Sequence, residues 1–308
     1  MPAQTCLTTG DMEQATSSAL ATAGKRYYDM AARGDAASLR QNAITSLATD
    51  FSGIENAVKD NHANLAVAQP APRPPFLLKA EGTEPLARAE FLCGVFGAQG
   101  QTRDSAVFVI PNLPPGNYGI VTLDAVSTQG AYNVSFVLQQ QAGDWKLGGF
   151  FVRLTQAAGH DGNWFADRAR EFKTRGQKHN AWFYYGEARE LLVPVPFMAT
   201  ATTDRLYDEM QTVKPADLPP VELAAGTKTY KLTDLFPVPV GQEFDLVVKY
   251  QSTDVSDSGR TFQDNAAVMK ALVGKYPEVR DAFAGIVVRA VEPSGRDYGS
   301  MLAMKDIK

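Results

Sequence analysis

The spacing of apolar residues changes once in the first half of the chain, and this change most narrows the choice of fold. Between residues 11 and 33 apolar residues recur every three to four positions, as on one face of a helix that ends before Gly34. Asp11 is placed to cap this helix. Shorter helices follow, and four prolines between residues 70 and 75 are expected to end regular structure.

After the prolines, the pattern is that of strands separated by turns. The expected strands span residues 76–80, 89–96, 106–110, 118–126, 132–139 and 145–154. The last two are expected to form an antiparallel hairpin. Helices followed by a bent antiparallel sheet define an α+β fold in which the helices pack on one face of the sheet.

Short stretches in residues 11–154 resemble the NTF2-like, cystatin-related cone family. They are the aromatic pair Tyr27-Tyr28, the run from Ala31 to Asp35, and the run from Gly143 to Phe151 with its Trp and its Gly-Phe pair. The resemblance implies a sheet that wraps around the first helix and encloses a cone-shaped cavity. A second interpretation compares the run from Leu113 to Tyr118 with small carbohydrate-binding-like β-sandwiches, although helices precede the sheet here.

A cone cavity would hold a small apolar molecule, and its lining can be named as a prediction. If Asp124 pointed inward, it would serve as a base; otherwise it is a solvated strand residue. Strand register decides which of Asp124, Tyr118 and Tyr132 faces inward. The candidate lining residues are Tyr27, Tyr28, Tyr118, Asp124, Tyr132, Trp145 and Phe150.

Residues 164–194 are similar to a single tetratricopeptide repeat, a hairpin of two helices. Small and aromatic residues alternate at the intervals of that repeat from Ala169 to Ala188, whereas Arg168 replaces the usual Leu and Pro194 comes one residue late. One such hairpin cannot bury its apolar face alone. We therefore expect it to pack on the first domain or on a helix near residues 203–210, as a strut and not as a peptide-binding groove.

The C-terminal part is expected to be a second small α+β domain. Prolines at 215, 219 and 220 indicate a linker, after which strands, a helix at 262–275 and a closing hairpin follow. The predicted domains are 7–158 (NTF2-like), 159–213 (helical hairpin) and 226–308 (C-terminal α+β). The pairs His160-Asp161 and Lys178-His179 are expected to lie in turns.

The chain has two cysteines, Cys6 and Cys93, and their pairing is left open by the sequence. They either form one disulfide, or Cys93 is a buried thiol that acts as a small apolar residue. Two cysteines and three isolated histidines lack the spacing of metal ligands, so no metal site is expected. The polar N-terminal stub and the cysteine usage favour a periplasmic or secreted protein whose leader has been removed; a cytoplasmic protein is the alternative.

Charge and motifs exclude several functions. The net charge of -4 gives no basic surface for nucleic acid, and no stretch approaches the roughly 20 apolar residues of a membrane span. No cofactor is expected. We therefore predict a non-enzymatic module outside the cytoplasm that binds a protein partner or a small apolar ligand. The alternative is an isomerase- or hydrolase-type enzyme that uses the cavity, and a purely structural protein without a cavity is a third candidate.

Overall fold

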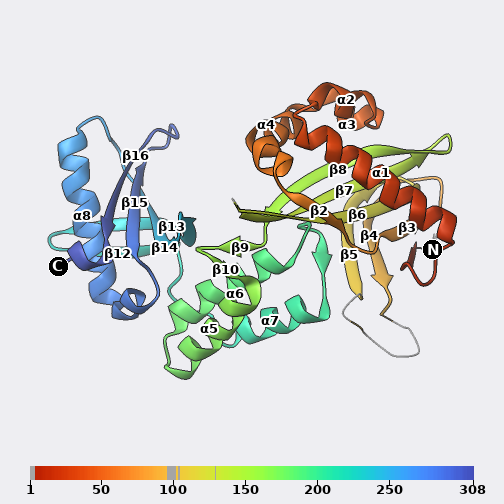
Figure 1. Ribbon diagram of the computed structural model, residues 1–308. Coiled ribbons are helices and arrows are strands. Elements are labelled where there is room, and N and C mark those ends of the chain that lie inside the picture. The colour runs from red at the N-terminus through yellow and green to blue at the C-terminus, as the bar shows by residue number, and fades with distance from the viewer. Residues whose placement is uncertain (1–3, 96–101, 103–104, 129) are drawn as a thin grey trace. The chain divides into compact units, whose positions relative to one another are not determined.

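The computed structural model describes residues 4–95, 102, 105–128 and 130–308 (Figure 1). The α+β class predicted from the sequence is confirmed. The chain forms two compact units: unit 1 comprises residues up to Gln156 together with Leu191–Arg205, and unit 2 comprises Ala157–Glu190 together with Leu206–Lys308. In this division the helical hairpin, up to Glu190, shares a unit with the C-terminal part.

Helices form one layer of unit 1. They are α1 (Gln14–Ala32), α2 (Ala36–Gln41), α3 (Thr45–Thr49) and α4 (Ser52–Ala66). Gly34 has a φ of +71°, a conformation that suits glycine, and it lets the chain turn between α1 and α2. Asp35 then caps α2 by accepting a hydrogen bond from the Ser38 amide.

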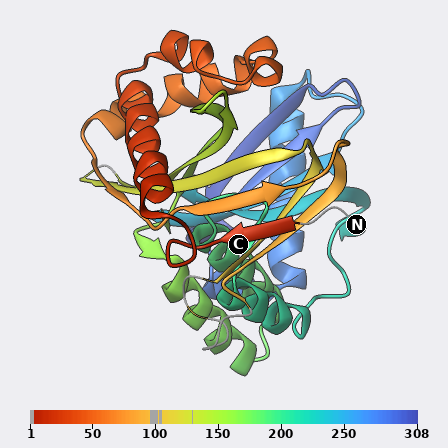
Figure 2. The same ribbon diagram turned by 90° about the vertical axis from the view of Figure 1, so that its right-hand side faces the viewer.

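The main sheet of unit 1 has the order β1-β3-β6-β7-β8, and neighbouring strands are antiparallel. Figures 1 and 2 show α1 lying along one face of this sheet. In the middle of the pairing between β7 and β8, Val137 pairs with Gly149 and Leu138 with Leu147, so Gly148 is an extra residue that bends the sheet. The strands are β1 (Gln4–Leu7), β3 (Phe76–Ala80), β6 (Gly116–Ser127), β7 (Gly130–Gln141) and β8 (Asp144–Leu154).

The proline run does not end regular structure as the sequence analysis expects. Residues Gln69–Pro72 form strand β2, which is antiparallel to β6. Within the described residues β2 pairs with β6 alone. A strand with one partner tolerates prolines because the missing N–H groups fall on its unpaired side.

A second sheet covers the other face of the main sheet. It consists of β4 (Leu86–Cys93), β5 (Ala106–Leu113) and β11 (Met198–Ala199) in the order β11-β5-β4. Its residues Phe91 and Phe108 share a buried cluster with Leu78 and Ile120 of the main sheet. Unit 1 therefore has two cores, one on each side of the main sheet. The predicted strand 89–96 begins earlier than expected, and its last residue lies outside the described residues.

The helical hairpin of unit 2 consists of α5 (Gly162–Thr174) and α6 (Lys178–Leu192), followed by α7 (Ala201–Gln211). Strands β9 (Gln156–Ala157) and β10 (His160–Asp161) precede it, and Asp161 caps α5 by accepting from the Trp164 amide. Lys178 and His179 were expected in a turn, but they open α6, because Gly176 completes the turn at a φ of +74°.

The C-terminal part of unit 2 is a five-stranded sheet of order β12-β13-β14-β15-β16 with α8 along it (Figures 1 and 2). β14 and β15 are parallel because α8 makes the crossover between them. The elements are β12 (Val221–Ala225), β13 (Lys228–Val240), β14 (Glu243–Gln251), α8 (Ser258–Lys275), η1 (Pro277–Asp281), β15 (Gly285–Val291), β16 (Asp297–Ala303) and η2 (Met304–Asp306).

The hairpin packs on this C-terminal part as well as on α7. The rings of Phe165 and Phe244 are 5.0 Å apart, and the Tyr184 hydroxyl donates to the Ala282 carbonyl at 2.6 Å. On the other side, Arg170 forms an ion pair with Glu209 of α7 at 2.8 Å. These contacts explain why the hairpin does not form a unit of its own.

Candidate functional site

Five of the seven candidate cavity residues lie together in the core between the helices and the main sheet. The rings of Phe136 and Phe150 stack at 5.4 Å, and Tyr27 lies 5.9 Å from Phe136. These side chains are buried and pack against one another in this core. The five residues are Tyr27, Tyr28, Tyr132, Trp145 and Phe150.

The tyrosine hydroxyls of this core bond to the protein itself. Tyr27 donates to the Trp145 carbonyl at 2.8 Å, and Tyr28 donates to the Leu65 carbonyl at 2.9 Å. Tyr132 accepts a bond of 3.1 Å from the Asn64 amide. Burial raises the pKa of Tyr27 and that of Tyr28, so both phenols stay protonated at neutral pH. Their arrangement is that of structural side chains.

Register places the other two candidates on the opposite face of the main sheet. Tyr118 belongs to the core under the second sheet, and its hydroxyl donates to the Pro114 carbonyl at 2.8 Å. Asp124 is partly exposed and accepts three bonds from the Arg73 guanidinium, two from Nε and the shortest, at 2.7 Å, from Nη2. Asp124 is therefore not an inward-facing base; it ties β6 to the segment after β2.

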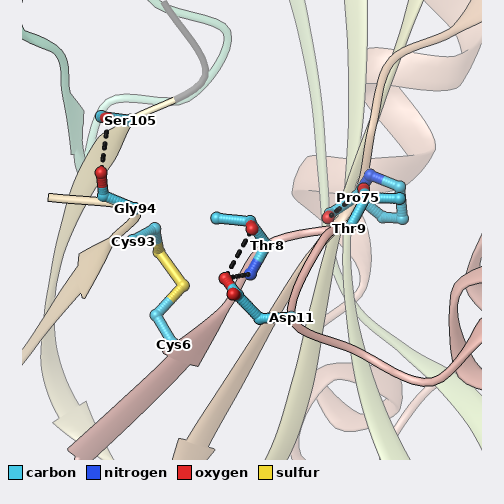
Figure 3. Close-up of a disulfide and its surroundings, with 8 residues drawn as sticks. All are labelled: Cys6, Thr8, Thr9, Asp11, Pro75, Cys93, Gly94 and Ser105. Carbon is cyan, nitrogen blue, oxygen red and sulfur yellow. Dashed lines mark hydrogen bonds between the residues drawn. A yellow bond between two sulfur atoms is a disulfide. The ribbon is translucent and has the colours of Figure 1, made fainter. Parts of the chain in front are cut away.

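Cys6 and Cys93 form a disulfide that joins β1 to the end of β4 (Figure 3). Cys93 is at the same time fully buried in the core under the second sheet. The chain leaves the disulfide through a tight turn in which Asp11 accepts bonds from the amide and the hydroxyl of Thr8. These bonds hold the pKa of Asp11 below its ordinary value. Asp11 thus closes this turn instead of capping α1, where Glu13 holds the cap position.

A pocket with a volume of about 230 Å³ lies beside this turn, within unit 1. Its wall combines four parts of unit 1. They are the turn after β1, the segment between β2 and β3, the face of β6 that is turned toward the second sheet, and the segment that carries β11. Thr9 joins the first two, since its hydroxyl lies 3.4 Å from the Pro75 carbonyl (Figure 3). The lining residues are Thr8, Thr9, Gly10, Arg73, Pro74, Pro75, Phe76, Ser105, Ile120, Thr122, Pro194 and Met198.

The chemistry of this pocket is apolar with hydroxyl groups at its wall. Prolines, Phe76, Ile120 and Met198 supply the apolar surface, whereas the hydroxyls are engaged within the protein. Ser105 donates to the Gly94 carbonyl at 2.7 Å, and the Thr122 and Ser135 hydroxyls are 2.9 Å apart. Among the described lining residues, Arg73 carries the one ionisable side chain, and it is paired with Asp124.

The sequence analysis did not find this pocket. Its walls come from segments near residues 8–10, 73–76, 120–122 and 194–198, which lie far apart in the chain. One signal in the sequence was the Pro74-Pro75-Phe76 run, which offers rigid apolar surface. Its prolines were expected only to end regular structure, and Phe76 was expected to begin the strand at 76–80.

Within the residues that the structure describes, no three His, Cys, Asp or Glu side chains gather in a way that could hold a metal ion. No described helix is both long and apolar enough to cross a membrane.

Comparison of the chain with known protein families, with curated proteins and with solved structures gives no match. By its architecture the chain is an α+β protein whose first unit places helices and a small second sheet on opposite faces of an antiparallel sheet. The resemblances to NTF2-like domains and to a tetratricopeptide repeat stay predictions.

Proposed function

We propose that the chain is a binding protein that works outside the cytoplasm and takes a small, mainly apolar molecule in the pocket beside the Thr8–Asp11 turn. The observation that carries this proposal is the pocket itself, with its wall of prolines, Phe76, Ile120 and Met198. Binding sites for small molecules are typically concave and mostly apolar, with a few polar groups that orient the ligand. The site is thus different from the cone cavity that the sequence analysis favours.

The disulfide supports the location. Disulfides persist in oxidising compartments and are rare where thiols are kept reduced. Here the bond between Cys6 and Cys93 fixes the N-terminal strand immediately before Thr8, which forms one wall of the pocket. An oxidising environment would therefore keep the pocket in the shape described.

The pocket wall favours binding over acid–base catalysis. A general acid or base must reach the reacting atoms and have a pKa near the working pH. The described wall offers Arg73, a hydrogen-bond donor whose guanidinium is engaged with Asp124. An isomerase or hydrolase that used this pocket would need an ionisable group from elsewhere.

Fluorescence titration with N-phenyl-1-naphthylamine, a neutral apolar probe, tests the proposal. We expect saturable binding with a Kd on the order of 10 μM, the affinity usual for a ligand of this size in an apolar site. Met198→Trp fills the pocket and should weaken binding at least tenfold. Met301→Trp is the matched control, because Met301 is an exposed methionine of unit 2 and its replacement should leave the Kd unchanged.

Two results would contradict the proposal. One is the absence of saturable binding by the wild-type chain, and the other is equal binding by the wild type and Met198→Trp. Circular dichroism of both variants shows whether a loss of binding comes from a loss of fold.

A further inference from the structure

His179 lies where three segments of unit 2 meet, and both of its ring nitrogens face carboxylates. Nδ1 is 2.9 Å from Oε1 of Glu278 in η1, and Nε2 is 3.0 Å from Oδ1 of Asp217 in the linker between α7 and β12. The His179 side chain is only 11% exposed. A buried imidazole held at both ends joins α6, η1 and the linker.

The protonation state of the ring decides how many of these bonds exist. A carboxylate only accepts hydrogen bonds, whereas a neutral imidazole has one N–H and one lone pair. The neutral ring can therefore donate to one of the two carboxylates, and the imidazolium can donate to both. We propose that His179 is a proton-dependent latch, which ties the linker at Asp217 to α6 when charged and releases it when neutral.

The surroundings decide which bond the neutral ring keeps. The Asp217 side chain is 40% exposed and has other donors, since the Tyr276 hydroxyl lies 2.8 Å and Lys275 Nζ 3.4 Å from its Oδ2. The Glu278 side chain is 22% exposed, so leaving its carboxylate without a donor costs more. The proton should stay on Nδ1, and the bond from Nε2 to Asp217 is the one that is lost.

The latch responds to His179 alone only if the carboxylates of Asp217 and Glu278, and the charged groups near them, keep the same charge between pH 5 and 8. Burial acts to raise the pKa of Asp217, but hydrogen bonds from Tyr276 and His179 outweigh it, and the pKa lies below its ordinary value. Asp217 therefore stays ionised between pH 5 and 8. The ring of Tyr276, which lies 4.2 Å from that of His179, and the ammonium of Lys275, which lies 3.4 Å from Asp217 Oδ2, are further titratable groups at this place.

The rest of the interface does not depend on this proton. Asn180 Nδ2 donates to the Glu278 carbonyl at 2.6 Å, and the Tyr184 hydroxyl donates to the Ala282 carbonyl at 2.6 Å. Burial raises the pKa of Tyr184 to about 12, so its bond persists through neutral pH. The hairpin stays docked on the C-terminal part in either state, and the linker is the segment that responds.

Nitrogen NMR of the full chain with ¹⁵N-labelled histidine tests the latch directly. At pH 5.5 we expect His179 to show two protonated ring nitrogens, and at pH 8 we expect the neutral ring to carry its proton on Nδ1. His62 and His160 are exposed and serve as internal references. A His179 ring whose protonation state is the same across the whole range from pH 5 to 8, either neutral or charged throughout, would overturn the inference.

Hydrogen exchange followed by mass spectrometry measures the effect on the linker. After correction for the intrinsic exchange rate, protection of residues 212–220 should fall at least tenfold between pH 5.5 and 8. His179→Gln should remove this pH dependence, and the control His62→Gln should keep it. If His179→Gln shows the same pH dependence as the wild type, another group is responsible and the proposal is wrong. The result is independent of ligand binding in unit 1.

Discussion

Two glycines, Gly24 of α1 and Gly119 of β6, leave no room for a side chain between α1 and the main sheet, and replacing one of them tests the packing of unit 1. A Cβ at Gly119 of β6 would overlap Leu20 Cδ2 and lie 3.4 Å from Leu20 Cγ. Leu20 is fully buried, so its side chain has little room to move. Gly24 of α1 is the counterpart, since a Cβ there would overlap Val121 of β6.

Gly119→Ala should lower the free energy of unfolding of unit 1 by about 1–2 kcal/mol. Overpacking a core typically costs about 1–3 kcal/mol. Ala also restricts the unfolded chain more than Gly does. This lower entropy of the unfolded state offsets the destabilisation by up to about 1 kcal/mol. Leu20→Ala alone leaves a cavity and should cost about 2–5 kcal/mol. In the double variant the new methyl group enters that cavity, so the combined cost should be smaller than the sum.

Urea unfolding followed by Trp145 fluorescence measures these energies. The chain has 3 tryptophans, and replacing Trp164 and Trp182 of unit 2 by Phe leaves Trp145 as a reporter of unit 1. Gly53→Ala is the matched control: nothing lies within 4 Å of a Cβ at this position of α4, and helix propensity predicts no loss of stability. An unchanged stability of Gly119→Ala, or additive costs in the double variant, would refute the packing argument.

Three further predictions concern the contacts that hold each unit together. Replacing Cys6 and Cys93 by Ser should lower the free energy of unfolding of unit 1 by about 2–5 kcal/mol in urea, because the crosslink spans a sequence separation of 87; an equal stability would contradict this. Tyr27→Phe should cost about 0.5–1.5 kcal/mol in the same assay, since the buried hydroxyl donates to the Trp145 carbonyl, and a neutral effect would show that this bond adds nothing. The hydrogen bond from Arg170 holds the pKa of Glu209 below its ordinary value, against burial. The stabilisation from this carboxylate is thus fully present above about pH 5 and is lost as pH falls through the lowered pKa. The stability of Glu209→Gln, followed by circular dichroism, should therefore depend less on acid pH than that of the wild type. An unchanged pH dependence would show that the pair of Arg170 and Glu209 does not cause it.

Much of the secondary structure follows from local patterns. The strands predicted at 76–80 and 145–154 match β3 and β8 within a residue. The predicted pair of helices corresponds to α5 and α6. These elements are defined by the spacing of their own apolar residues and by the glycines between them, so neighbouring residues suffice to predict them. The α+β class follows from their order.

The position of the proline run shows where local patterns fail. Pro70 and Pro72 were expected to end regular structure, yet they lie in β2 opposite Ala125 and Leu123 of β6. The backbone conformation of Pro70 and Pro72 is compatible with a strand. The segment becomes a strand only because β6 is available as a partner on one side. The second sheet also depends on a partner that is distant in the sequence, because β11 pairs with β5 across a large separation.

The sequence by itself determined the type of most elements and the α+β class, because apolar spacing and turn residues act over a few neighbours. The tertiary structure decided which surfaces meet. Register placed Tyr132 inward and Asp124 outward, folding brought Thr8, Pro75 and Met198 to one pocket, and it set His179 between two carboxylates. These contacts depend on long-range pairing, in which a shift of one residue turns every side chain of a strand to the other face.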